Sequence, residues 1–235
     1  MSFFIPILTI ILATLILTSL QLVPGVFALF YHYALGKNST KKAHSLSPYF
    51  ILGHATFLII IWLLIYSFIF VLCYNLSNEF INLTIYIIAG LLFAESLLSF
   101  FRYYQKGTAT ELFISRTTAK ALTVHAENSK TASDIFTLGF FSGIPELLFA
   151  APIFAISSLA LMQIDINLRP LILSICVVLA LLPLFIILQL YRSDRNLANL
   201  ERLRVHLKPI FRLIICLSFL GLAIAGISLG VISHG

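Results

Sequence analysis

The stretch Gly139–Phe154, with the sequence GFFSGIPELLFAAPIF, raises the question that decides the fold of this chain. It is apolar enough to lie inside a membrane, yet it carries glycine, two prolines and a carboxylate, Glu146, near its middle. Irregular backbone is tolerated at membrane depth only where it is buried in protein or lines a water-filled cavity. The stretch therefore predicts an interrupted membrane helix beside a polar space.

The composition of the whole chain indicates a membrane protein. Of its 235 residues 60% are hydrophobic and 10% are charged, and the mean hydropathy is +1.04. A soluble domain contains about 45–50% apolar residues. We therefore expect an integral membrane protein whose first partner is the lipid bilayer. The net charge of +6 fits a protein face near anionic lipid and gives no reason to expect nucleic-acid binding.

Long apolar runs predict the membrane spans. A spanning helix needs about 20 mostly apolar residues. Six runs meet this length: 7–35, 49–73, 81–101, 136–162, 170–191 and 209–232. They predict an all-α fold of six transmembrane helices, in which the N-terminal run is retained as the first helix.

The basic residues predict the orientation of these helices. Cytoplasmic loops of membrane proteins carry an excess of Lys and Arg. All of the 15 Lys and Arg residues except Arg169 lie in or beside the connections that follow the first, third and fifth helices. These connections are therefore predicted to be cytoplasmic, with both termini outside a plasma membrane.

Prolines recur at matching positions in the two parts of the chain. Pro24 in the first helix and Pro145 in the fourth are separated by nearly the same number of residues as Pro48 and Pro170, which are predicted to open the second and fifth helices. This spacing predicts two repeats of three helices. Because three is odd, the second repeat enters the membrane inverted relative to the first. Inverted repeats with interrupted helices in matching positions are typical of secondary transporters, whose site lies near the midplane between the repeats.

The predicted organisation has three parts: a first repeat at 1–101, a linker at 102–135 and a second repeat at 136–235. Within the cytoplasmic linker, 115–127 is predicted to form a short surface helix whose apolar side faces the lipid. The alternatives are that it gates the cytoplasmic opening or binds a partner. Thr131 and Asp134 have the spacing of a capping box, with Asp in place of Glu. They predict that the fourth helix begins after Thr131.

Several of these features together resemble the LysE-type exporter superfamily. They are the first helix broken at LQLVPGVFALFYHYALGK, the short basic loop into YFILGHATFLII, the long linker, and a fourth helix that opens with LGFFSGIPELLF. The resemblance implies export of a small solute, which is an amino acid in the best-known branch and a metal ion in others. The chain departs from it at Pro24-Gly25, where an amino-acid exporter would carry a fuller Gly-Pro-Gly-Pro pattern.

Glu146 is the first candidate for the polar site. At a rise of 1.5 Å per residue it lies roughly 15 Å along a helix that enters near residue 136, close to the midplane. An ionised carboxylate there costs about 2.5–3.5 kcal/mol, so it should be neutral, paired or in contact with water. Two compatible hypotheses stay open. Glu146 binds a cation or the coupling proton in a cavity, or it complements the N-terminus of a half-helix that starts at Pro145.

Four further residues are candidate substrate-binding or proton-binding groups: Glu95, Gln21, His54 and His32. Glu95 lies two turns before Arg102, and it either accepts a hydrogen bond from a neighbouring helix or marks a cytoplasmic access path to Glu146. Gln21 lies at about the depth of Glu146 in the other repeat. The two histidines lie near the cytoplasmic ends of their helices, where a histidine either relays protons or anchors the helix.

Small residues and prolines predict two more features. Helix breaks are expected at Pro24, Gly25, Gly143 and Pro145. Gly226 and Gly230 have the four-residue spacing that lets helix backbones touch. This contact is predicted within the monomer, with a homodimer interface as the alternative.

No cofactor, metal site or catalytic residue is predicted, and the chain is not expected to be an enzyme. It has no phosphate-binding loop, nucleophile motif or zinc-hydrolase pattern, and its histidines and glutamates lack the spacing of metal ligands. An intramembrane enzyme would need catalytic groups that converge on Glu146 and Glu95. The sequence instead favours a small secondary transporter that exports an amino acid or a cation by alternating access. The alternative is a non-transporting membrane scaffold or assembly protein, and water access to Glu146 separates the two.

Overall fold

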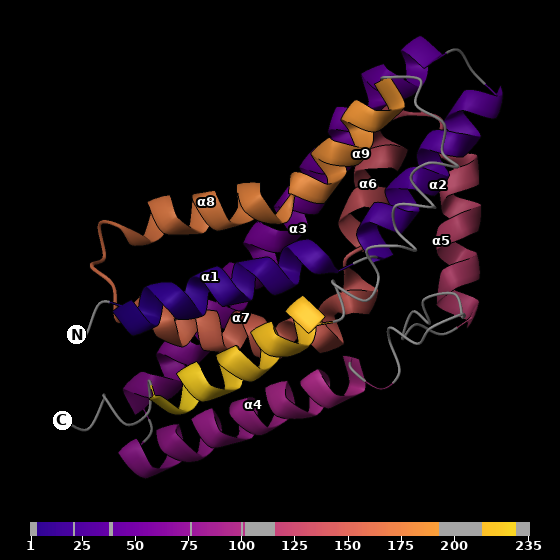
Figure 1. The fold of residues 1–235 in the computed structure, drawn as a ribbon. Coiled ribbons are helices and arrows are strands. Elements are labelled where there is room, and N and C mark those ends of the chain that lie inside the picture. Colours follow the sequence, from indigo (N-terminus) through magenta and orange to yellow (C-terminus); the bar gives the residue numbers. More distant parts are fainter. Residues whose placement is uncertain are drawn as a thin grey trace.

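The computed structural model describes residues 4–20, 22–37, 40–75, 77–99, 101, 116–192 and 213–228, and every regular element in these ranges is helical (Figure 1). In chain order the elements are α1 (Phe4–Ser19), α2 (Leu22–Lys37), α3 (Thr40–Asn75), α4 (Asn78–Leu98), α5 (Arg116–Asn128), α6 (Ala132–Phe141), the 3-10 turn η2 (Ile144–Glu146), α7 (Leu147–Met162), α8 (Arg169–Ala180) and α9 (Leu182–Arg192). A further helix, Leu213–Ser228, is called the C-terminal helix below.

The helices form a bundle with two ends that differ in their connections (Figure 1). At one end α1 begins, α7 ends and α8 begins; we call it the α7–α8 end. At the other end α2 ends, and α3 and α6 begin; we call it the α2–α3 end. α3 extends from one end of the bundle to the other.

The helices have the length and composition of a protein that crosses a membrane several times. Four stretches qualify as spans: Phe4–Tyr31, His44–Asn75, Glu79–Leu98 and Arg169–Leu190. Ala132–Glu146 and Phe149–Met162 add a fifth if they are one span, although they meet at 87°. The predicted sixth span, 209–232, is described only over the C-terminal helix, which is shorter than the roughly 20 residues that a span needs. The prediction of an all-helical membrane protein is confirmed, and four or five of the six predicted spans have the required length within the described ranges.

The first predicted helix is interrupted, but not where its proline and glycine lie. α1 ends at Ser19 and α2 begins at Leu22, so the interruption lies on the N-terminal side of the predicted position, Pro24-Gly25, and these two residues are in α2. The ring of a proline clashes with the carbonyl group four residues earlier. For Pro24 that carbonyl belongs to Leu20, which is not helical. Pro24 itself lies in the first turn of α2, where its missing N–H has no helical partner to lose.

The second and fifth helices also differ from the prediction. Pro48 does not open its helix, because α3 begins at Thr40 and continues through Pro48. Pro170, its predicted counterpart, does lie in the first turn of α8. The apolar run 170–191 is divided at Leu181 into α8 and α9. Pro183 in the first turn of α9 accounts for this division, since its ring prevents α8 from continuing.

α3 and α6 cross so closely that their backbones touch. A Cβ atom on Gly53 of α3 would overlap the carbonyl oxygen of Phe136, and one on Gly139 of α6 would overlap the carbonyl oxygen of Phe50. Small residues let membrane helices approach closely enough for van der Waals packing to hold them together in lipid. The two glycines therefore set the distance between α3 and α6 from both sides.

Aromatic side chains continue this interface along α3. Phe57 packs edge-on against Phe140 of α6, with ring centroids 5.7 Å apart. Trp62, which is 1% exposed, packs against Phe154 of α7 with ring centroids 5.5 Å apart. The contacts advance along both chains together, so α3 runs in the same direction as α6 and α7.

The start of α6 confirms the predicted capping box. The Thr131 hydroxyl accepts a hydrogen bond from the Asp134 N–H at 3.2 Å, and the Asp134 carboxylate accepts one from the Thr131 N–H at 3.0 Å.

The short helix α5 lies within one residue of the predicted range 115–127. The sequence analysis predicted that the apolar side of α5 faces lipid. In the structure α5 instead packs on α2 and α6, and Ala126 is buried. Figure 1 shows α5 alongside α2.

Arg169, the one basic residue apart from the others in the sequence, is held by three hydrogen bonds at the α7–α8 end. Nε and Nη2 donate to the carbonyl oxygens of Ile164 and Met162, each at 2.9 Å. Nη1 donates to the Tyr66 hydroxyl of α3 at 2.7 Å. Arg169 thus satisfies backbone carbonyls where α7 ends, which would otherwise lack partners.

The glycine crossing can be tested by adding single methyl groups. We expect Gly53→Ala and Gly139→Ala each to lower the free energy of unfolding by about 1–3 kcal/mol, because the helices must move apart to admit the Cβ atom. Gly90→Ala in α4 is the matched control, since nothing lies within 4 Å of its Cβ position. Unfolding of the detergent-solubilised protein by sodium dodecyl sulfate, followed by fluorescence of its single tryptophan, measures the change. Equal stability of all three variants would contradict a backbone contact.

The hydrogen bonds of Arg169 give a second prediction. Arg169→Gln should lower the free energy of unfolding by about 1.5–3 kcal/mol, the range for hydrogen bonds to charged groups, because the carbonyls at the end of α7 lose their donors. Lys130→Gln, an exposed position before α6, should leave stability unchanged. The same unfolding titration compares them. A wild-type midpoint for Arg169→Gln would mean that water replaces the guanidinium without loss.

Candidate functional site

Glu146 lies at the break between α6 and α7. α6 ends at Phe141, and η2 covers Ile144–Glu146 before α7 follows directly. The turn is closed by the Glu146 N–H, which donates to the carbonyl oxygen of Gly143 at 3.2 Å. Pro145 accounts for the interruption, since its ring would meet the carbonyl of Phe141 if α6 continued. This break lies where Gly143 and Pro145 predict it.

The aromatic ring of Phe57 closes the α3 side of this break. A Cβ atom on Gly143 would overlap the ring, so glycine allows α6 to end directly against α3. The Glu146 side chain is half-buried and, at the N-cap of α7, makes no side-chain capping hydrogen bond. Its position at a helix N-terminus still favours a negative charge. A half-buried carboxylate at such a place is suited to bind a cation or a proton.

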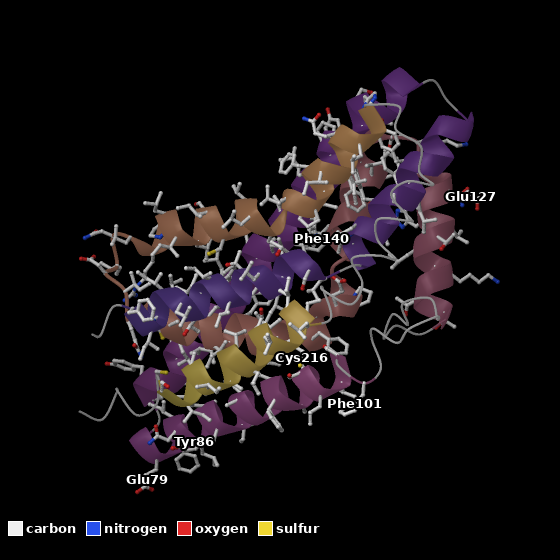
Figure 2. The ribbon with its side chains drawn as sticks, in the orientation of Figure 1. Glu79, Tyr86, Phe101, Glu127, Phe140 and Cys216 are labelled. Atoms are coloured by element: carbon white, nitrogen blue, oxygen red, sulfur yellow. The ribbon has the colours of Figure 1, made fainter. Side chains whose placement is uncertain are left out.

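Glu95 is enclosed more completely than Glu146. It is 8% exposed, and its Oε2 atom is buried with no hydrogen-bond partner. Its neighbour Ser96 donates a hydrogen bond to the carbonyl oxygen of Cys216 in the C-terminal helix at 3.0 Å. In Figure 2 Glu79 and Tyr86 lie on the outward side of α4, and Cys216 of the C-terminal helix lies on the opposite side of α4. Because ionisation is costly in this surrounding, we expect Glu95 to be neutral in this conformation.

The register of α4 and α7 brings Glu95 towards the level of Glu146. The two helices pack against each other and run in opposite directions (Figure 1). A Cβ atom on Gly226 would touch both Ile156 of α7 and Ala89 of α4, so these two residues lie at one level. Glu95 follows Ala89 along α4 and Glu146 precedes Ile156 along the chain, so both acids lie in the same direction from that level. The prediction of a path between these two acids stays a prediction, and their depths are compatible with it.

His54 belongs to the glycine crossing and not to the break. It is 8% exposed, and its ring hydrogen-bonds the backbone of Gly139 and stacks on Phe57 with ring centroids 5.9 Å apart. Its Nδ1 atom is buried with no hydrogen-bond partner. These ring contacts favour the anchoring interpretation of His54 over the proton relay.

Two predicted site residues lie outside what the structure describes. These are Gln21 and the side chain of His32, so their roles stay predictions.

The structure adds a contact that the sequence analysis missed, in which the Tyr31 hydroxyl of α2 hydrogen-bonds the His44 ring of α3 at 2.8 Å. No spacing signal could have found it, because the two residues meet only through the packing of α2 on α3. Of the glycine pair predicted to allow close helix contact, Gly226 packs inside the monomer and Gly230 is not described.

Within the described part of the chain, no group of three or more His, Cys, Asp or Glu side chains could hold a metal ion. Comparisons with protein-family models, with curated proteins and with solved structures find no match to this chain.

The neutral state of Glu95 leads to a third prediction. Glu95→Gln should be at least as stable as the wild type at neutral pH, because the amide has nearly the shape of the neutral acid and cannot ionise. Glu79→Gln at the exposed start of the same helix is the control. Both are measured by detergent unfolding. A loss of about 3–5 kcal/mol in Glu95→Gln would instead indicate a buried ion pair.

Proposed function

We propose that this protein is a small secondary transporter that exports a small solute, an amino acid or a cation, by alternating access. The observation that carries the proposal is Glu146, a carboxylate held at a helix break inside a membrane bundle. In secondary transporters the ends of broken helices bind substrates and coupling ions near the midplane. Glu95 supplies a second carboxyl group on a helix that packs against α7.

The exchange of packing partners between the two predicted repeats supports an inverted repeat. α3 of the first repeat packs on α6 and α7, while α8 and α9 of the second repeat pack on α1 and α2. α4 packs on α7, and Gly221 of the C-terminal helix faces Leu12 of α1. Each contact thus has a counterpart from the other repeat. Two inverted repeats around a two-fold axis would produce this reciprocity.

The distribution of basic residues supports an orientation in a plasma membrane. The connections rich in Lys and Arg follow α2, α4 and α9, and α2 ends at the α2–α3 end of the bundle. By the positive-inside rule this end is cytoplasmic. The α7–α8 end is then outside, and Arg169 is the basic residue that faces that side. Export, rather than uptake, rests on the resemblance to LysE-type exporters.

The rival function is a membrane scaffold in which Glu146 only packs between helices. The two functions differ in water access to the break, which a cysteine at the break reports. Cys73→Ala, Cys176→Ser and Cys216→Ser give a background without native thiols. Into it Glu146→Cys and, separately, Leu147→Cys are introduced, the second of which leaves the carboxylate in place.

The fourth prediction is that a membrane-impermeant maleimide labels both cysteines in oriented vesicles, and that the rate depends on the side of addition. The rate should depend on the side of addition because alternating access exposes the break to one side of the membrane at a time. Ser158→Cys in α7 is the control, because this position is fully buried and should not react. Absence of labelling at 146 and 147 from both sides, in folded protein, would favour the scaffold.

A further inference from the structure

Two groups of neighbouring helices each contain helices from both predicted repeats, and the two groups also pack against each other. The first group contains α3, α6 and α7, joined by the glycine crossing and by the contact of Trp62 with Phe154. The second group contains α1, α2, α8 and α9, because α8 packs on α1 and α9 packs on α2. The groups meet where α1 packs along α7 and where α3 packs on α2 and α8. A polar contact between the groups would resist their separation.

Arg169 makes such a contact at the α7–α8 end. It is the first residue of α8, in the second group, and all three of its acceptors lie in or directly after helices of the first group. The bonds to Met162 and Ile164 span only a few residues of chain and hold the connection between α7 and α8. The bond to Tyr66 instead reaches α3, far away in the sequence. It is therefore the one of the three that must break if α3 and α8 move apart.

A second tyrosine hydroxyl joins the same two groups at the α2–α3 end. Tyr31 of α2, which is 1% exposed, hydrogen-bonds His44 near the start of α3 at 2.8 Å. The two rings meet edge-on, with centroids 5.5 Å apart. In the described conformation both tyrosine contacts are formed, so the two groups are held together at both ends.

We propose that the hydrogen bond between Arg169 and Tyr66 is a latch that closes the outer end of the transport path, and that the contact between Tyr31 and His44 is its counterpart at the cytoplasmic end. This inference rests on the proposed transport function. Arg169 and Tyr66 are both half-buried, so water can replace each partner when the bond opens. The net stabilisation by one charge-assisted hydrogen bond is small enough to break reversibly, yet large enough to shift an open-to-closed ratio about tenfold.

The test removes one hydroxyl at a time in the Leu147→Cys protein of the thiol-free background. Tyr66→Phe keeps the ring and the two backbone bonds of Arg169, and it should raise the rate of maleimide labelling from the outer side about tenfold. Tyr31→Phe should raise labelling from the cytoplasmic side. Tyr86→Phe, which removes a hydroxyl from a 54% exposed tyrosine on α4, should change neither rate. The tryptophan fluorescence of each variant verifies that it is folded.

The outcomes separate the latch from the transport function itself. Side-dependent labelling of the parent Leu147→Cys protein, without an increase in Tyr66→Phe from the outer side, would overturn the latch and leave the transporter standing. Absence of labelling in the parent and in every variant would overturn both. An increase from both sides in Tyr66→Phe would also contradict the latch, because a general loosening of the bundle is not an opening at one end.

Discussion

The crossing of α3 and α6 is the contact on which the rest of the bundle depends. Lipid tails are as apolar as leucine, so helices in a membrane associate through close packing and not through the exclusion of water. Gly53 and Gly139 bring the two backbones together, and Phe57 can then lie directly over Gly143. That position is where α6 has to stop. The interrupted helix is therefore set against α3 by packing, while Pro145 supplies the reason that it is interrupted.

The interruption places the carboxylate of Glu146 at the N-terminus of a helix, whereas in a continuous helix Glu146 would lie in the helix interior. Glu146 lies at the N-terminus of α7, and its side chain accepts no capping hydrogen bond from the backbone N–H groups of that helix. Glu95 lies on the antiparallel helix α4, enclosed and with one oxygen atom lacking a partner. A carboxyl group inside a membrane costs free energy unless it is neutral, paired or in contact with water. This cost is the reason for proposing that the two acids bind a cation or a proton.

Arg169 is exceptional both in the charge pattern of the sequence and in the number of hydrogen bonds that its side chain donates. In the positive-inside analysis it is the single exception among the basic residues. In the structure its guanidinium binds two carbonyls at the end of α7 and the hydroxyl of Tyr66. A planar group with five donors is suited to this task, because it can serve several acceptors at once. The exception to the topology rule is thus a residue with a separate structural purpose.

The sequence by itself determined those features that depend on neighbours along the chain. The class of all-helical membrane protein follows from the apolar runs, the capping box follows from the spacing of Thr131 and Asp134, and the break at Pro145 follows from the covalent ring of proline. Tertiary structure decided the features that depend on which helix lies opposite. Among these are the passage of α3 through Pro48, the covering of α5 by α2, the enclosure of Glu95 and the bond from Arg169 to Tyr66. Periodicity and spacing describe one helix at a time, whereas these features arise from contacts between helices far apart in the sequence, and only packing brings such helices together.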